Sequence, residues 1–261
     1  MLYQPFFLNA TSRYTRHVMD SYGISHFYTF VAENDGSGVL GIPDGCTDML
    51  LCCSNDKRPL TVCGTGLSPR KLNVTKGERY FGVRFLPGFF LTEDNQLSFA
   101  DTVGKDIFYD KLTDMCEKII EADDFYQRID IFLESYMRKY KEPVGDKAAA
   151  IRDRIIHTNG KDTVESIAEE TGYCRRYLTR VFREAFGMTP KAFSDIIRLQ
   201  CIIRLFRNGM NEVDNQRLAD EFGFYDQSHL LRFFRKYLGI TPKNCDQFVS
   251  ADGYLKKLVI I

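Results

Sequence analysis

Residues 167–190 and 218–242 follow the same pattern of apolar and polar positions. Each copy starts with a short amphipathic segment, turns at a glycine, Gly172 or Gly223, and continues with apolar positions at helical spacing. Glycine at that place allows the left-handed backbone that ends a helix in a tight bend. The pattern predicts that each copy is a helix, a turn and a second helix.

The end of each copy is marked as clearly as its start. Gly187 and Gly239 fit the C-terminal cap of the second helix, and each is soon followed by Thr-Pro, which suits the first turn of the next helix. The copies therefore predict two helix-turn-helix units, at about residues 163–186 and 214–238.

The second helix of each copy keeps a polar outer face once its apolar stripe is assigned to the core. In the first copy this face consists of Arg175, Arg176, Thr179, Arg180 and Arg183. In the second copy it consists of Gln227, Ser228, His229, Arg232, Arg235 and Lys236. Arg and Gln can bind guanine and adenine edges with two hydrogen bonds, and Ser, Thr and Lys can bind phosphates. The alternative is a solvated polar surface, but its repetition in both copies favours DNA binding.

The first half of the chain changes to short apolar runs separated by turn residues. The predicted strands are 26–32, 39–42, 48–53, 60–63, 72–74 and 79–85. We therefore expect an α+β protein, in which a β-rich, mostly antiparallel sheet or barrel with flanking helices precedes an all-α domain.

Between the halves, residues 123–140 predict a helix. Its apolar face comprises Phe125, Ile129, Phe132, Leu133, Tyr136 and Tyr140. Such a face can pack in the core or form a homodimer with a second copy, and both alternatives stay open. Pro143 and Gly145 in the adjoining linker predict a boundary between a sensor or dimerisation domain, 1–142, and a DNA-binding domain, 143–261.

The charge distribution supports a difference between the halves. The chain has 35 basic and 35 acidic residues, but from residue 143 onward it has 19 basic against 15 acidic residues.

No secretory signal or membrane span is recognisable, so we expect a cytoplasmic protein with no membrane partner and with reduced cysteines. The eight cysteines include no C-x-x-C spacing, and we predict no metal site and no cofactor.

Residues 147–249 resemble the DNA-binding domain of the AraC/XylS family of bacterial regulators. The resemblance is carried by both repeats, above all by the stretch Gly223-Phe224-Tyr225-Asp226-Gln227-Ser228-His229-Leu230 and by Gly239-Ile240-Thr241-Pro242. This resemblance implies seven helices, of which a long central one lies at 191–207. It also implies that the protein binds double-stranded DNA and contacts RNA polymerase. It also implies that each recognition helix enters a major groove, and it aligns Cys174 and Tyr225 with the N-caps of those helices.

Two short segments in the first half, residues 42–46 and 82–88, resemble segments of the N-terminal domain in one branch of the same family. The resemblance does not identify a ligand. The polar residues Asp44, Cys46, Asp48 and Arg84 are, from their chemistry, a candidate small-molecule effector site inside such a domain. The alternative is that Pro-Asp-Gly is a turn and that Arg84 pairs with a carboxylate.

The predicted function is a sequence-specific, effector-responsive transcription regulator that is not an enzyme. A different class, a thiol-based redox or alkyl-transfer protein fused to a DNA-binding module, is raised by Cys52-Cys53 and by Cys174 beside Arg175. That class requires an activated thiolate.

Overall fold

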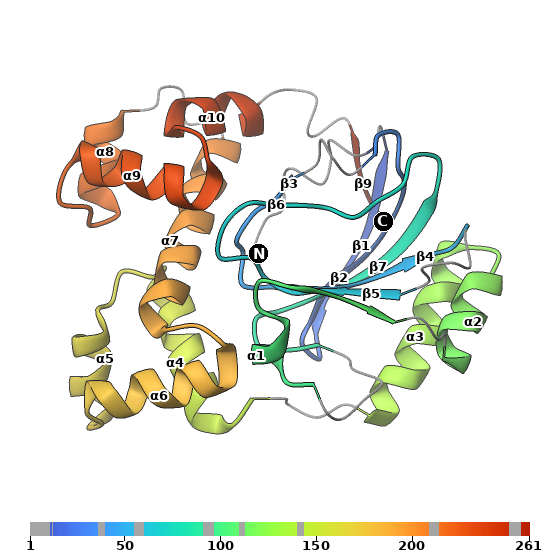
Figure 1. Ribbon diagram of the computed structural model, residues 1–261, viewed down its shortest axis with the longest axis horizontal. Coiled ribbons are helices and arrows are strands. Elements are labelled where there is room, and N and C mark those ends of the chain that lie inside the picture. Colours follow the sequence, from blue (N-terminus) through green and yellow to red (C-terminus); the bar gives the residue numbers. More distant parts are fainter. Residues whose placement is uncertain are drawn as a thin grey trace.

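A computed structural model of the chain describes residues 11, 13–35, 40–54, 60–90, 97–109, 113–139, 144–208, 214–250 and 257–261. A twisted sheet with two helices forms one side of the molecule, and a group of helices forms the other (Figure 1). This arrangement agrees with the α+β class and with the order of sheet and helices expected from the sequence.

The sheet has seven strands in the order β8-β5-β4-β7-β2-β1-β9. Its strands are β1 (Tyr14–Ser21), β2 (Ile24–Val31), β4 (Thr47–Cys52), β5 (Leu60–Cys63), β7 (Arg79–Phe85), β8 (Asp106–Tyr109) and β9 (Leu258–Ile260). Neighbouring strands are antiparallel except β1 and β9, which are parallel. Strands β3 (Leu40–Gly41) and β6 (Arg70–Lys71) form a separate pair. The predicted strand at 72–74 is therefore wrong by two residues, because the pairing occurs at 70–71.

Alternation along β7 shows how the sheet separates two environments. Phe81, Val83 and Phe85 point to one face, where they pack with apolar side chains of α2 (Asp114–Glu121) and α3 (Phe125–Lys139). Gly82 faces the other side, where the ring of Tyr28 lies so close that a Cβ on residue 82 would meet it at 2.0 Å. A glycine is required there because two strands bring a ring against the backbone.

The structure confirms the predicted helix as α3 and places most of its apolar face against the sheet. Ile129, Phe132 and Tyr136 are buried against the sheet of the same chain. Phe132 makes an edge-on contact with Phe27, at 5.6 Å between ring centroids. This burial favours the core alternative for the apolar face, and a homodimer through this helix stays a prediction. Tyr140 and linker residues 141–143 lie outside the described residues.

Residues 144–250 form the seven helices that the family resemblance implies. They are α4 (Asp146–His157), α5 (Val164–Thr171), α6 (Arg175–Phe186), α7 (Pro190–Arg207), α8 (Asn215–Glu221), α9 (Gln227–Leu238) and α10 (Pro242–Ser250). Helix α7 starts at the Thr189 N-cap, whose side chain accepts a hydrogen bond from the Ala192 amide, and at Pro190. It is buried along most of its length, and the two helix-turn-helix units lie towards its two ends (Figure 1).

The two halves share part of one core. Ile42 and Phe99, from the first half, belong to the same apolar cluster as the helices of the second half. Phe99 begins α1 (Phe99–Thr102) and meets Phe186 of α6 at a centroid distance of 5.4 Å. Gln200 of α7 donates a hydrogen bond of 3.0 Å to the Pro43 carbonyl oxygen. The sheet domain therefore packs directly on the first helix-turn-helix unit.

Candidate nucleic-acid interface

The first helix-turn-helix unit presents α6 on the surface. Thr163 caps α5, Gly172 adopts a left-handed conformation with φ of 70°, and α6 follows after a short turn. Leu178, Phe182 and Phe186 anchor α6 in the core. The predicted DNA-binding residues Arg175, Arg176, Arg180 and Arg183 are exposed, Thr179 is half-buried, and all five line one shallow open hollow together with Glu184.

Two of these arginines are held by carboxylates in the free protein. Arg175 Nη2 lies 2.7 Å from Glu165 Oε1, and Arg180 Nη1 lies 3.2 Å from Glu184 Oε1. The Arg180 guanidinium also stacks over the Tyr177 ring at 5.4 Å. Exposed ion pairs contribute at most about 1 kcal/mol, so phosphate or base edges can replace these carboxylates on binding. Arg176 and Arg183 have no ion pair among the described residues.

The second unit repeats this arrangement with a different set of side chains. Leu230, Phe233, Phe234, Tyr237 and Leu238 bury one side of α9. The predicted contact residues on its other side, Gln227, Ser228, His229, Arg232 and Lys236, are all exposed. Gln227 donates a hydrogen bond of 3.2 Å to the side chain of Gln216 on α8, which connects the two helices of the unit.

The N-caps of the two recognition helices differ from each other. Cys174 caps α6 and makes no side-chain hydrogen bond to the helix, as the sequence suggests. The cap of α9 is Asp226 rather than Tyr225, and its carboxylate accepts a hydrogen bond of 2.6 Å from the His229 amide. The prediction of Tyr225 was wrong because the second copy has one more residue in its turn, which moves the helix start forward. Tyr225 is instead 94% exposed.

The candidate effector residues of the first half do come together, but inside the protein. Arg84 on β7 donates a hydrogen bond of 2.8 Å to Asp48 Oδ2 and another to Asp44 Oδ2. The Cys46 amide donates to Asp44 Oδ1 at 2.9 Å. All four residues are buried. Burial raises the pKa of Asp48 to about 7, against the effect of a hydrogen bond from Tyr28.

This cluster holds the 42–46 loop to the sheet, and the same loop contacts α7 through Pro43 and Gln200. The arrangement favours the alternative drawn from the sequence, in which Arg84 pairs with carboxylates. An effector site built from these four residues remains a prediction.

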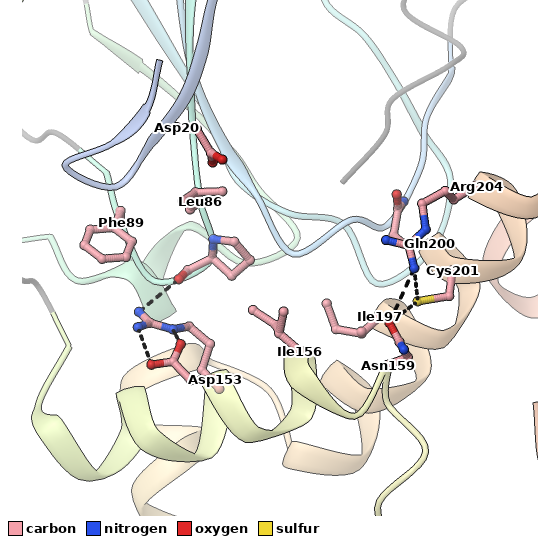
Figure 2. Close-up of a pocket in the computed structure, with 12 residues that line it drawn as sticks. Asp20, Leu86, Phe89, Asp153, Ile156, Asn159, Ile197, Gln200, Cys201 and Arg204 are labelled. Carbon is pink, nitrogen blue, oxygen red and sulfur yellow. Dashed lines mark hydrogen bonds and ion pairs between the residues drawn. The ribbon is translucent and has the colours of Figure 1, made fainter. Parts of the chain in front are cut away.

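A pocket that the sequence did not predict lies where the sheet domain meets the helices. It has a volume of about 270 Å³ and is lined by the 86–89 turn after β7 and by residues of α4 and α7 (Figure 2). Its residues come from segments that are far apart along the chain, so no local pattern could reveal it.

The cysteines give little support to thiol chemistry. Burial raises the pKa of the thiols of Cys46, Cys53, Cys63, Cys201 and Cys245, which keeps them protonated. Cys52 is buried and donates a hydrogen bond of 3.2 Å from Sγ to Glu78. Cys174 is exposed.

Among the described residues, no group of three or more His, Cys, Asp or Glu side chains could hold a metal ion. No helix of the described part of the chain has the length and apolar character needed to cross a membrane.

Comparison with known proteins assigns the helical part of the chain. Residues 156–247 match the model of a helix-turn-helix domain family. An uncharacterised HTH-type transcriptional regulator, YbfI of Bacillus subtilis, is 35% identical over 68 residues, which are 26% of this chain and 24% of that protein. A second uncharacterised HTH-type regulator, from Haemophilus influenzae, is 28% identical over 87 residues, covering 33% of this chain and 28% of that protein. The chain thus spans about a quarter of the length of these relatives.

Among solved structures, ToxT of Vibrio cholerae is similar over 86% of this chain and 97% of its own, with 11% identity and a TM-score of 0.45. A probable AraC family transcriptional regulator from Rhodopseudomonas palustris is 24% identical over 40% of this chain and 98% of its own, with a TM-score of 0.36. The family match and the two relatives confirm the helix-turn-helix prediction for the second half.

Proposed function

We propose that this protein is a sequence-specific DNA-binding transcription regulator of the AraC family, because residues 156–247 match the model of a helix-turn-helix domain family. One observation carries the proposal. Two exposed recognition helices, α6 and α9, belong to units joined by one largely buried helix, α7, so their separation is fixed by a rigid element.

The dimensions of α7 suit binding to two grooves. At about 1.5 Å per residue, its 18 residues span about 27 Å. Its flanking turns then bring α6 and α9 towards the ~34 Å of one duplex turn. Since the second half carries a modest excess of positive charge, 19 basic against 15 acidic residues, simultaneous binding of two grooves must supply much of the affinity.

The two recognition helices have different roles in this proposal. The four exposed arginines of α6 suit phosphates and guanine edges, whereas α9 offers Gln227, Ser228 and His229 beside Arg232 for a mixed set of base contacts. Arg180 and Arg232 occupy equivalent outward positions and are the residues that we expect to contact bases in both units.

Regulation by a small molecule through the N-terminal domain belongs to the same proposal, as does contact with RNA polymerase. The support for regulation is the packing of Phe99 on Phe186 and the hydrogen bond from Gln200 to Pro43. A ligand that changes this contact changes the position of the first helix-turn-helix unit.

Selection of bound sequences from random duplex DNA tests the proposal. The full chain should enrich one motif with two segments about one helical turn apart, and a footprint on that motif should cover both segments on one DNA face. The matched control is the double substitution Arg180→Ala with Arg232→Ala, which should enrich no motif. Equal recovery of all sequences by the unmodified chain would contradict sequence-specific binding.

A further inference from the structure

A polar cavity lies between the sheet and the start of α3, the helix on the side of the sheet away from α6 and α9 (Figure 1). Its volume is about 480 Å³, within the ~300–1,000 Å³ of typical ligand pockets. Thr15, Thr29 and Arg79 line it from β1, β2 and β7, and Arg128 lines it from α3. The described residues around it all belong to the sheet domain, so this cavity is separate from the proposed DNA interface.

Arg128 supplies a buried cation to this cavity. The residue is 6% exposed, and its Nη2 donates a hydrogen bond of 2.9 Å to the Ala122 carbonyl oxygen. Its Nε is buried without a hydrogen-bond partner, and no carboxylate of the described residues forms an ion pair with its guanidinium. A buried charge costs free energy unless it is paired and hydrogen-bonded. Arg128 therefore favours an anion in the cavity.

The register of the sheet brings two more arginines to the same cavity. Val31 of β2 pairs with Arg79 of β7, and Arg13 lies one residue before the pair that Tyr14 of β1 forms with Phe30. Neighbouring strands are about 4.8 Å apart, so Arg13 and Arg79 flank Val31 with their Cα atoms ~10 Å from each other. Both arginines are exposed and line the cavity, and neither forms an ion pair within the described part of the chain.

The carboxylates that line the cavity are in contact with solvent. Glu33, Asp123 and Asp124 are all exposed, whereas Arg128 is buried. Asp124 Oδ1 also accepts hydrogen bonds from two amides at the start of α3, those of Tyr126 at 2.8 Å and Gln127 at 2.9 Å. Solvent and salt screen exposed charges much more than a buried one. An anion therefore meets a net attraction inside the cavity, even though three acidic residues lie around it.

A phosphate group fits this set of donors. A phosphomonoester carries about −1.5 to −2 charges at neutral pH and three strong acceptor oxygens, and arginine is well suited to bind it with two parallel hydrogen bonds. The cavity offers three guanidinium groups and the hydroxyl of Thr15, which has no hydrogen-bond partner among the described residues.

We propose that this cavity binds the phosphate group of a small phosphorylated molecule, with the phosphate on Arg128 and between Arg13 and Arg79. The volume exceeds that of a phosphate ion and leaves room for a polar body, whose hydroxyl groups can donate hydrogen bonds to Glu33 and Asp123. Binding itself does not depend on the proposed function. Only the role of the ligand in regulation rests on that function.

Calorimetric titration of the full chain with glycerol 3-phosphate, glycerol and inorganic phosphate at fixed ionic strength tests the proposal. Glycerol 3-phosphate should bind and glycerol should not, because the phosphate carries the charge. Inorganic phosphate lacks the hydroxyl-bearing body and should bind at least about threefold more weakly, as expected for the loss of one or two neutral hydrogen bonds. Equal affinity for the two phosphates would overturn the proposal in favour of free phosphate as the ligand.

Substitutions test the position of the phosphate. Arg128→Gln should weaken binding of glycerol 3-phosphate by about ten- to a hundredfold, as expected for the loss of hydrogen bonds to a charged group, and Arg128→Lys should retain part of the affinity. Because Arg128 is buried, thermal denaturation checks that each variant is folded. Arg79→Gln changes an exposed side chain and should weaken binding by about threefold or more. The matched control is Arg217→Gln, at an exposed arginine of α8, which should bind like the unmodified chain.

Absence of glycerol 3-phosphate binding by the unmodified chain, or unchanged binding in Arg79→Gln and in folded Arg128→Gln, would overturn the proposal. These results are independent of DNA. A chain that binds glycerol 3-phosphate but enriches no DNA motif would refute the proposed function alone, and the reverse result would refute the phosphate site alone.

Discussion

The two helix-turn-helix units share one architecture but have different surroundings. Both recognition helices end at a left-handed glycine, Gly187 with φ of 64° and Gly239 with φ of 72°. A Cβ added at Gly187 would lie 2.7 Å from the Ala100 carbonyl oxygen. A Cβ added at Gly239 would have no atom of another described residue within 4 Å. The first unit is therefore fitted against the sheet domain, and the second packs through α9 on α8 and α7.

Under the proposed function, this difference assigns the two units different tasks. The first unit has an arginine-rich recognition helix, no side-chain cap, and a direct contact with the domain that we expect to sense a ligand. The second unit has a capped helix with a mixed polar face. Regulation should therefore act mainly through the first unit, while the second supplies a stable anchor on DNA.

The largest expected effect is a loss of stability when the contact between the sheet domain and the first unit is removed. Phe99→Ala removes a ring that is 2% exposed and packs on Phe186. We expect the free energy of unfolding to fall by about 3–5 kcal/mol, as for other large-to-small core changes, in chemical denaturation.

The control for this substitution is Phe108→Ala, at a ring that is 48% exposed, where the loss should stay within about 0.5 kcal/mol. In Phe99→Ala, amide hydrogen exchange should increase more in α6 than in α9. Equal increases in both helices would show that the sheet domain does not support the first unit selectively.

The next effect concerns the equivalent arginines of the two recognition helices. Arg180→Ala and Arg232→Ala should each weaken binding to the selected site by about 1–3 kcal/mol at fixed salt, without loss of the fold. The salt dependence sharpens the comparison. If Arg180 binds a phosphate rather than a base, its removal lowers the salt slope by about one and affects all sequences alike. Affinity equal to that of the unmodified chain would exclude either residue from the interface.

The smallest effect concerns the caps of the recognition helices. Asp226→Ala removes the hydrogen bond to the His229 amide and should cost about 0.5–2 kcal/mol of stability. Cys174→Ser introduces the missing cap in the first unit and should add up to about 1 kcal/mol. Thermal denaturation of both variants measures these changes, and a loss of stability in Cys174→Ser would show that the thiol has a role other than capping.

The sequence predicts the helical half well because its signals are local. The glycines that end α6 and α9, the Thr-Pro pairs and the helical spacing all act within a few residues. Strands β1, β8 and β9 were not predicted. Strand β1 mixes polar and apolar positions, and β9 has three residues whose pairing with β1 depends on a contact across the whole chain.

The candidate effector site also depends on features that local sequence patterns do not show. Asp44, Asp48 and Arg84 were grouped correctly, but whether they bind a ligand or one another depends on burial, which the sequence does not show. The division into domains 1–142 and 143–261 remains a proposal. The sequence places the boundary next to Pro143 and Gly145, yet Ile42 and Phe99 of the first half join the core of the second half.

The central claim, that both units bind DNA at once across a rigid α7, is tested most directly by changing the DNA. Five base pairs inserted between the two segments of the selected site turn the second segment to the opposite face of the duplex. The control replaces five base pairs at the same place without changing the length. We expect the insertion to reduce affinity to near that of a single unit while the replacement leaves it unchanged. Undiminished binding to the longer site would show that only one unit contacts DNA.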